Sequence, residues 1–288
     1  GVRRERERMV LDWGERHLRD LPWRRTRDPW AVLVSEVMAQ QTGVDRVAPY
    51  YERFLARFPT PPVCAAAPPG EVLQLWTGLG YNRRAVYLHR CARAVVDRHG
   101  GVLPADLAAL MALPGVGPYT ARAVLAFAFE HDVGVVDTNV GRVLARWEGR
   151  PLRVTEAQAQ ADDLVPRGRA WAWNQAVMDL GGTVCLRRLP RCASCPVRRC
   201  CAWAAAGLAP PDPADGSAGV GAGQARFEGS DRQGRGRLVE ALCRGPVAVA
   251  DLPTVMDWPD DPARADRVAV GLLEDGLAVR DGAVLRLP

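Results

Sequence analysis

The sequence predicts an all-α protein that ends in a small mixed module, and three observations support this fold class. Apolar residues recur at helical spacing in one stretch after another as far as residue 206. No run with the period of a β-strand occurs before residue 240. A Pro/Gly/Ala-rich segment at 208–230, which has little apolar content to pack, separates these helices from the last residues and is expected to be a linker.

Ten stretches before this segment have the apolar spacing of helices, and glycines mark several of the turns between them. The expected helices lie at 7–18, 30–41, 44–58, 71–79, 82–99, 104–112, 119–129, 137–147, 156–164 and 170–180.

The helix expected at 30–41 carries a single charged residue, Glu36, among valine, leucine and methionine. A carboxylate on an apolar helix is costly unless it is paired or has a chemical task. Burial would also raise its pKa toward the range of a general acid. A partly exposed glutamate at the edge of the helix explains the sequence equally well.

The stretch Leu113-Pro-Gly-Val-Gly-Pro-Tyr-Thr120 places a G-x-G turn between two of the expected helices. Glycines permit a tight turn whose backbone approaches another molecule closely. Free amides in the turn and at the start of the second helix can hold a phosphate. On the glycines alone, an ordinary turn between two helices is the simpler interpretation.

Eight cysteines occur, and five of them fall between residues 185 and 201. This spacing favours metal ligation over disulfides. The set Cys185-x6-Cys192-x2-Cys195-x5-Cys201 can hold zinc or a [4Fe-4S] cluster, with Cys200 as a spare neighbour. Only one tight pair is present, which favours the cluster, and structural zinc is the alternative. The remaining cysteines, Cys64, Cys91 and Cys243, are expected to be packed thiols.

After the linker, helices are expected at 235–243 and 264–275, with a short one within 247–255. The stretch 277–287 predicts a hairpin with a type I′ turn at Asp281-Gly282. Three helices and a terminal hairpin resemble a winged helix at 231–288.

The net charge of +5 suits a polyanionic partner, and all 38 basic residues are arginine because the chain contains no lysine. No apolar run is long enough for a signal peptide or a membrane helix, so no membrane association and a cytoplasmic location are expected.

Five motifs occur together and in order, and over residues 8–206 they resemble the MutY adenine DNA glycosylases of the helix-hairpin-helix glycosylase superfamily. The short C-terminal module resembles that of actinobacterial members. The motifs are Ser35-Glu-Val-Met-Ala-Gln-Gln-Thr42, Leu75-Trp-Thr-Gly-Leu-Gly-Tyr81, Leu113-Pro-Gly-Val-Gly-Pro-Tyr-Thr120, Val136-Asp-Thr-Asn-Val140 and the cysteine loop.

The resemblance implies a monofunctional glycosylase that flips adenine out of the duplex. Glu36 would protonate adenine N7 and then assist the attacking water. Asp137 would stabilise the oxocarbenium-like sugar or bond to it, with Tyr119 and Asn139 assisting. Asp137 by itself also fits the N-cap of a helix, and the two roles are compatible. Related bifunctional enzymes carry a Schiff-base lysine at the position of Tyr119, a route that is closed in a chain without lysine.

The resemblance also implies where DNA binds. Hairpin residues Gly115, Val116 and Gly117 would hold a backbone phosphate, with a bound monovalent cation. Gln41 and Tyr81 would wedge into the duplex, assisted by Gln40. Basic side chains expected at the DNA surface are Arg83, Arg84, Arg187, Arg188 and Arg191, the last three of which lie between Cys185 and Cys192.

By the same resemblance, the chain is expected to be two-lobed and monomeric, to carry a [4Fe-4S] cluster and to act at the nucleoid. Its partner would be double-stranded DNA with adenine opposite 8-oxoguanine or guanine. The cluster lobe is expected at 1–21 and 136–207 and the helical barrel at 22–135, with Glu36 facing Asp137 across the cleft.

The sequence departs from the family in two places. Thr138 stands where many members have glycine, and little chemical effect is expected because Asn139 is retained. The Phe-Ser-His loop of members with a larger C-terminal domain is absent, which leaves the reading of the opposite base open. Three alternatives remain: a thymine or uracil mismatch glycosylase, a non-catalytic DNA-binding protein, and a redox iron–sulfur protein. Glu36 favours the adenine enzyme, because protonating a purine requires an acid at that position.

Overall fold

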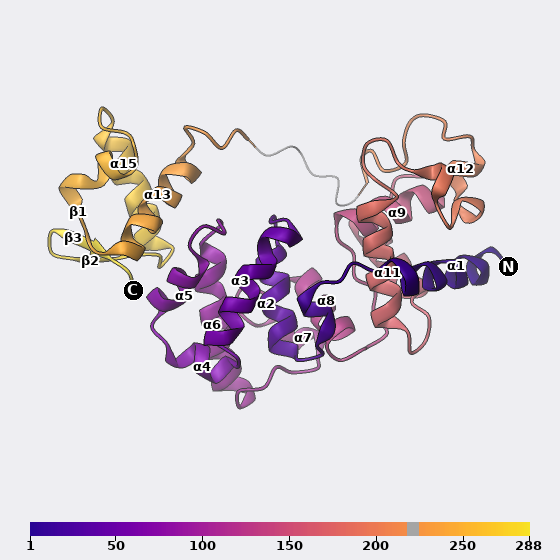
Figure 1. Cartoon of the computed structure of the whole chain (residues 1–288), viewed down its shortest axis with the longest axis horizontal. Coiled ribbons are helices and arrows are strands. Elements are labelled where there is room, and N and C mark those ends of the chain that lie inside the picture. Colours follow the sequence, from indigo (N-terminus) through magenta and orange to yellow (C-terminus); the bar gives the residue numbers. More distant parts are fainter. Residues whose placement is uncertain (218–224) are drawn as a thin grey trace. The chain divides into compact units, whose positions relative to one another are not determined.

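The computed structural model describes residues 1–217 and 225–288, which form two compact units (Figure 1). Unit 1 holds residues 1–32, 105–107 and the described residues from 117 to 217. Unit 2 holds residues 33–104, 108–116 and 225–288. This division differs from the expected lobes, because the helix that follows the glycine hairpin belongs to unit 1 with the cysteine loop.

All ten helices expected before the linker are present, with ends that differ by a few residues. They are α1 (Val2–His17), α2 (Pro29–Ala39), α3 (Val44–Arg57), α5 (Pro69–Trp76), α6 (Arg83–His99), α7 (Leu107–Met111), α8 (Pro118–Phe127), α9 (Thr138–Glu148), α10 (Val154–Leu164) and α11 (Ala170–Thr183).

Several short elements were not expected from the sequence, because they are too short to show a period. They are α4 (Pro61–Ala66), α12 (Ala202–Ala205) and the 3-10 turns η1 (Pro22–Arg25), η2 (Cys192–Ser194) and η3 (Arg198–Cys200).

The core of unit 1 forms where α11 packs against α1 and α9. Trp13, Trp147 and Trp173 are buried in it. Gly181 on α11 permits this packing, because a Cβ atom there would lie 2.8 Å from Cβ of Asn139. In unit 2 the core includes Phe54 and Trp76, whose rings meet edge to face at 6.1 Å.

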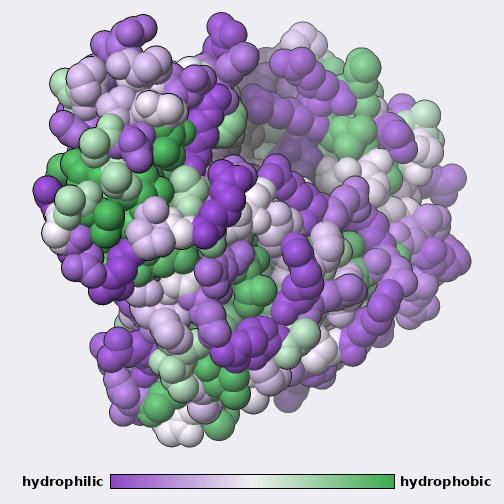
Figure 2. Space-filling model, turned by 60° about the vertical axis from the view of Figure 1, so that its left-hand side comes forward, coloured by the Kyte–Doolittle hydropathy of each residue, from purple (hydrophilic) through white to green (hydrophobic). Residues whose placement is uncertain are grey.

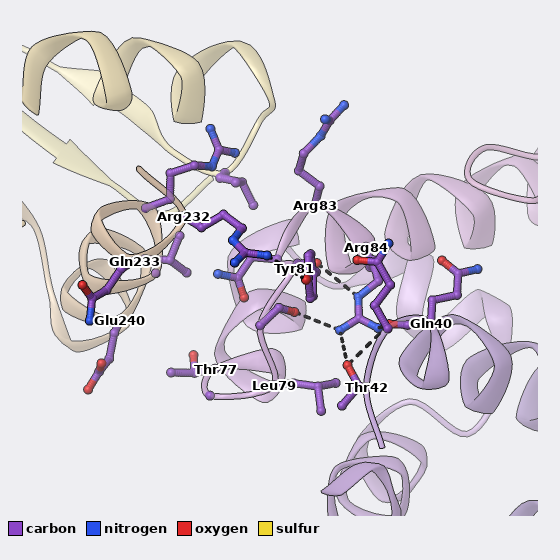
Figure 3. A pocket seen from close by; sticks show the side chains of 18 of the residues that line it. Gln40, Thr42, Thr77, Leu79, Tyr81, Arg83, Arg84, Arg232, Gln233 and Glu240 are labelled. Carbon is purple, nitrogen blue, oxygen red and sulfur yellow. Dashed lines mark hydrogen bonds between the residues drawn. The ribbon is translucent and has the colours of Figure 1, made fainter. Parts of the chain in front are cut away.

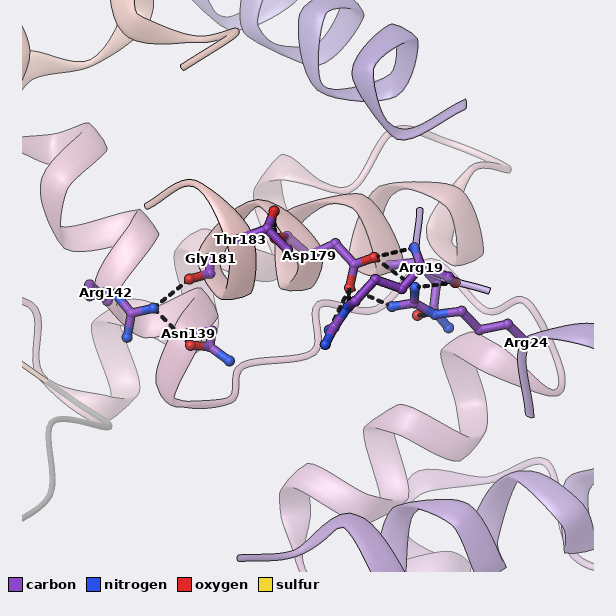
Figure 4. A network of polar contacts seen from close by, with 8 residues as sticks. Arg19, Arg24, Asn139, Arg142, Asp179, Gly181 and Thr183 are labelled. Atoms are coloured by element: carbon purple, nitrogen blue, oxygen red, sulfur yellow. Dashed lines mark hydrogen bonds and ion pairs between the residues drawn. The ribbon is translucent and has the colours of Figure 1, made fainter. Parts of the chain in front are cut away.

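A buried carboxylate ties the residues after α1 to α11 (Figure 4). Asp179 is fully buried and accepts hydrogen bonds from the guanidinium groups of Arg19 and Arg24 at 2.7–3.0 Å. The Arg19 backbone N–H donates to the same carboxylate at 2.8 Å. Arg24 also donates to the Gln175 side chain. Charge-assisted bonds therefore hold the chain between α1 and α2, in addition to the burial of Leu21.

The first part of the expected linker, residues 208–217, packs against the rest of unit 1, although its low apolar content predicted that it would not pack. Ala214 and Ser217 are buried. The Ser217 hydroxyl accepts a hydrogen bond from the Leu152 backbone N–H at 3.0 Å, and Asp212 forms an ion pair with Arg146 at 2.6 Å. Polar anchoring replaces the apolar content that the segment lacks.

The C-terminal module contains the expected helices and hairpin, together with a strand that was not expected. Its elements are α13 (Asp231–Arg244), β1 (Val247–Ala248), η4 (Val249–Asp251), α14 (Leu252–Val255), α15 (Pro262–Glu274), β2 (Val279–Asp281) and β3 (Val284–Arg286). The strands form an antiparallel sheet in the order β1-β3-β2.

The hairpin turn differs from the expected type I′ turn at Asp281-Gly282. Asp281 pairs with Val284, so the two loop residues are Gly282 and Ala283. Gly282 has a φ of 59°, whereas Ala283 is not among the residues with positive φ. A type I′ turn needs positive φ at both positions, so that assignment was wrong.

Candidate functional site

Asp137 caps the N-terminus of α9, and its side chain accepts a hydrogen bond from the Val140 backbone N–H at 2.7 Å. The Asn139 side chain also hydrogen-bonds to this carboxylate. Arg142 fixes the orientation of Asn139 by donating to its amide oxygen at 2.7 Å (Figure 4). The same guanidinium donates to the Gly181 carbonyl. The structure therefore brings Asp137 and Asn139 together.

Burial raises the pKa of Asp137 above its ordinary value of 3.8, although hydrogen bonds and the Arg142 charge act in the opposite direction. The folded protein consequently binds this proton more tightly than the unfolded chain does. The free energy of unfolding must then fall as the pH rises from 3.8 through the raised pKa of the folded state. Above its ordinary pKa the buried carboxyl group therefore lowers the free energy of unfolding, as is common at functional sites.

We expect Asp137→Asn to raise the melting temperature at neutral pH. Asparagine is as good an N-cap as aspartate and carries no buried charge. The gain should shrink as the pH falls toward 3.8, because the unfolded chain then also begins to bind the proton that the folded protein holds on Asp137. Thermal unfolding followed by circular dichroism across this pH range tests the prediction. Asp261→Asn, at the exposed N-cap of α15, is the matched control. A gain that does not vary with pH would contradict the role given to burial.

Glu36 is buried, with 8 % of its surface exposed, so the alternative of a partly exposed glutamate is wrong, and the general-acid role stays a prediction. It lies in the part of α2 that belongs to unit 2, and its apolar neighbours Val37 and Met38 are also buried. Tyr119 is half-buried on α8 in unit 1, the unit that holds Asp137 and Asn139.

The two expected wedge residues share an unusual backbone conformation. Gln41 has a φ of 59° and Tyr81 a φ of 48°, in the left-handed region that non-glycine residues rarely adopt. Both side chains are exposed. Strained backbone of this kind concentrates at functional sites, where the surrounding structure enforces it.

Two loops carry these residues, 40–42 with Gln41 and 78–82 with Tyr81, and we call them the wedge loops. Arg84 enforces their conformation by joining them (Figure 3). Its guanidinium donates to three carbonyls at the C-terminal end of α2, those of Val37, Met38 and Gln40, at 2.6–2.9 Å. It also donates to the Thr42 hydroxyl at 3.2 Å and to the Gly80 carbonyl at 3.0 Å.

The expectation that Arg84 lies at the DNA surface is therefore wrong. Its donors are occupied inside the protein, and burial lowers its pKa to about 10, which leaves it charged at neutral pH. Arg83, one residue earlier on α6, is exposed as expected.

The glycine hairpin is tightly turned. The Val116 N–H donates to the Leu113 carbonyl at 3.2 Å, and Gly115 has a φ of 75°. A Cβ atom at Gly115 would lie 2.8 Å from Cβ of Tyr87, so only glycine fits this position without a shift. Gly117 is exposed and is the N-cap residue of α8.

Four of the five clustered thiols influence one another. The pKa of Cys195 is raised to about 11, chiefly by burial and to a smaller extent by the neighbouring thiols of Cys185, Cys201 and Cys192. Cys200 differs, because burial and then the charges of Glu5 and Arg6 on α1 act on it. As placed among the described residues, however, no three His, Cys, Asp or Glu side chains are arranged to hold a metal ion.

Arg146, on α9, holds the start of the cysteine loop. It donates to the Leu186 carbonyl at 2.7 Å and to Cys185 Sγ at 3.3 Å, while Cys201 Sγ donates to its carbonyl at 3.3 Å. Arg142, one turn earlier, donates to the Cys185 carbonyl at 2.7 Å. Asp137 and the cysteine loop are thus attached to the same helix.

The tip of this loop is basic and exposed. Arg187 and Arg188 are exposed, and among the described residues neither forms an ion pair. Between them and Cys192 lies Leu189, which is 90 % exposed with a φ of 50°. The loop therefore offers unneutralised guanidinium groups to a polyanion.

Sequence reasoning missed the positioning roles of Arg84, Arg142 and Arg146. Arg84 and Arg142 donate chiefly to backbone carbonyls, and Arg146 donates to the Asp212 carboxylate, to Cys185 and to two carbonyls. Most of these partners lie on distant segments, which no local pattern reports. The one available signal was the spacing of Arg142 and Arg146, which places two cations on the same face of a largely apolar helix.

Within the described part of the chain, no helix is long and apolar enough to cross a membrane. Hydrophilic side chains cover most of the face shown in Figure 2.

Comparison with known proteins defines the class of this fold and site. Residues 34–166 match the family model described as "HhH-GPD superfamily base excision DNA repair protein". The fold is similar to a solved thermostable thymine-DNA glycosylase, with a TM-score of 0.66 and 29 % identity over 71 % of this chain and 97 % of the other. The predicted helix-hairpin-helix glycosylase fold is confirmed, whereas the iron–sulfur cluster and the winged-helix-like module stay predictions.

More similar relatives identify the family. Adenine DNA glycosylase of Mycolicibacterium smegmatis is 43 % identical over 93 % of this chain and 90 % of its own length. Adenine DNA glycosylase of Mycobacterium tuberculosis is also 43 % identical, over 97 % of this chain and 92 % of its own length. The chain belongs to the adenine DNA glycosylase family.

Proposed function

We propose that this protein hydrolyses the N-glycosidic bond of adenine mispaired with 8-oxoguanine or guanine in DNA, as a base excision repair enzyme. The observation that carries the proposal is the pair of carboxyl groups with contrasting environments. Glu36 is buried on an apolar helix, and Asp137 caps α9 beside an oriented asparagine. Two carboxyl groups in different environments are the usual machinery of glycosidic bond hydrolysis.

In the proposed mechanism each carboxyl group acts on a different part of the nucleotide. Glu36 donates its proton to adenine N7, which makes the base a better leaving group, and then accepts a proton from the attacking water. Asp137, ionised, stabilises the positive charge that develops on the sugar. Asn139 and Tyr119 orient these groups. The raised pKa of Asp137 predicts an acid limit to activity, because its protonated form cannot stabilise a cation.

The absence of lysine from the chain supports a hydrolytic enzyme that does not cut the DNA strand through a Schiff base. The product is then an abasic site. Hairpin residues Gly115, Val116 and Gly117 bind a backbone phosphate; the amides of Gly115 and Gly117 serve as donors, because that of Val116 donates to the Leu113 carbonyl. No step of this mechanism depends on the monovalent cation expected at the hairpin.

The donor set of the cysteine loop fits a [4Fe-4S] cluster. Cys185, Cys192, Cys195 and Cys201 interact electrostatically, whereas Cys200 interacts with α1, which leaves four thiols in the ligand role. Such a cluster, when bound, would join four thiolates and order the loop. The loop would present Arg187 and Arg188 to DNA phosphates.

The order of elements in the C-terminal module, α13, β1, α14, α15 and the β2–β3 hairpin, supports a winged-helix-like assignment. Double-stranded DNA is the proposed partner of the whole chain, which acts as a monomer at the nucleoid.

Single-turnover cleavage tests the proposed function. Duplexes with adenine opposite 8-oxoguanine, adenine opposite guanine, and thymine or uracil opposite guanine are incubated with the protein, and alkali then cuts any abasic site. Adenine should be released from the first two. Glu36→Gln should lower the rate by about a hundredfold or more, the usual contribution of a general acid.

Glu52→Gln, on the exposed face of α3, is the matched control and should leave the rate unchanged. Release of only thymine or uracil would replace the proposed function with that of a pyrimidine mismatch glycosylase. It would also remove the role given to Glu36.

A further inference from the structure

A basic pocket of about 1190 Å³ lies within unit 2, where the C-terminal module meets the wedge loops (Figure 3). Residues 40–43 and 77–84 line one side, and residues from α13 and the start of the terminal hairpin line the other. The pocket exceeds the usual size of a small-molecule site, about 300–1,000 Å³, which suits a segment of a polymer.

Most of the arginines that line this pocket have partners inside the protein. Asp275 pairs with Arg235 at 2.6 Å and with Arg83 at 3.5 Å. Arg237 pairs with Asp257 at 3.1 Å. The guanidinium of Arg84 is bound by the wedge loops, as described above.

Arg232, on α13, is set apart by its contact with the hydroxyl of a wedge residue. Like Arg46 and Arg84, which also line the pocket, it forms no ion pair within the described residues, so its charge is not neutralised by a carboxylate. Its Nη1 donates to the Tyr81 hydroxyl at 3.1 Å, and its Nη2 donates to the Ala225 carbonyl at 2.9 Å. The guanidinium also lies 5.5 Å from the centre of the Phe227 ring. These contacts hold the side chain in one place and leave further N–H donors available.

We propose that Arg232 is a specificity-determining residue that binds the base opposite the extruded adenine, through the O6 carbonyl that guanine and 8-oxoguanine share. The proposal rests on the proposed function, in which Tyr81 enters the duplex as a wedge. A guanidinium in contact with a side chain inside the base stack reaches base edges, and purine O6 is a preferred acceptor for arginine. The C-terminal module would thus complete the site formed by the wedge loops.

The competing possibility is that Arg232 binds a phosphate. Phosphate contacts are made most often by exposed cations at the surface. Arg187 and Arg188 have that character, whereas Arg232 is half-buried and is hydrogen-bonded to the wedge tyrosine. Its position favours contact with a base edge.

Binding affinities of the full-length protein test the proposal. The duplexes carry 2′-fluoro-2′-deoxyadenosine, which resists cleavage, opposite guanine, 8-oxoguanine or 2-aminopurine, the last of which lacks O6. Arg232→Ala should weaken binding about tenfold opposite guanine and 8-oxoguanine and leave the 2-aminopurine duplex almost unchanged. Tyr81→Phe, which removes the hydroxyl partner but keeps the ring, should give a smaller change of the same pattern.

Arg244→Ala is the matched control, because Arg244 lies on the same helix, is exposed, and does not line the pocket. Equal weakening on all three duplexes, with a salt slope reduced by about one, would identify a phosphate contact and overturn the proposal. An effect no greater than that of Arg244→Ala would also overturn it. Adenine release by the unaltered protein separates these results from failure of the proposed function, because that activity does not depend on the outcome for Arg232.

Discussion

Replacing Asp179 with alanine should lower the free energy of unfolding by about 3–5 kcal/mol, the usual cost of removing one partner from a buried ion pair. The variant would leave Arg24, whose side chain is only 7 % exposed, without its counter-charge. Burial opposes ionisation of Asp179, but the hydrogen bonds from Arg24 and Arg19 outweigh it and lower the pKa of this carboxyl.

The lowered pKa of Asp179 determines how the stabilisation by its ion pairs depends on pH. The stabilisation is fully present above the ordinary value of 3.8 and is lost only as the pH falls through the lower pKa of the folded state. Urea unfolding at neutral pH and in acid measures the difference. Asp163→Ala is the control, because its ion pair with Arg3 is exposed and should contribute less than about 1 kcal/mol. A similar loss of unfolding free energy in both variants would show that the buried network stabilises the fold no more than an exposed ion pair does.

Replacing Arg84 with methionine should disable the wedge loops while α6 remains folded. Methionine retains the apolar stem but leaves several carbonyl groups without a donor, each at a cost of about 1–3 kcal/mol if it stays buried. The loops would relax so that water reaches these groups, and Gln41 and Tyr81 would lose their strained conformations.

Hydrogen exchange at 40–42 and 78–82 should therefore rise, and single-turnover base release should fall by about tenfold or more, since misplacing a positioning group by about 1 Å can cost a hundredfold. Arg84→Lys should restore little, because a single ammonium group cannot reproduce the fork of donors. Arg93→Met, on the exposed face of α6, is the control. Normal exchange in the loops of Arg84→Met would refute the positioning role.

The sequence was sufficient for features that follow from local patterns. Helical periodicity located the helices, and the cap at Asp137 followed from its place before an apolar run. The motifs placed the chain in its family. The burial of Glu36 could not be decided locally, because it depends on which elements pack over its face of α2.

Features that depend on distant backbone groups were not predictable. The partners of Arg84 are the end of one helix and the turn before another, so its role appears only when the chain is folded. Residues 208–217 have a linker composition, yet Asp212 and Ser217 find polar partners in unit 1. The hairpin turn lies one residue later than predicted, because the pairing register of the two strands, rather than the Asp-Gly pair, determines which residues form the loop.

The attachments along α9 have a mechanical consequence for unit 1. A helix is stiff along its axis. Asp137 caps the N-terminus of α9, and Arg142 and Arg146, farther along the same helix, hydrogen-bond to the cysteine loop. Arg142 donates both to the Cys185 carbonyl and to the Asn139 amide oxygen, so a displacement at the start of that loop is expected to reach Asn139. The carboxylate and the basic tip of the loop should therefore move as one rigid body when DNA is engaged.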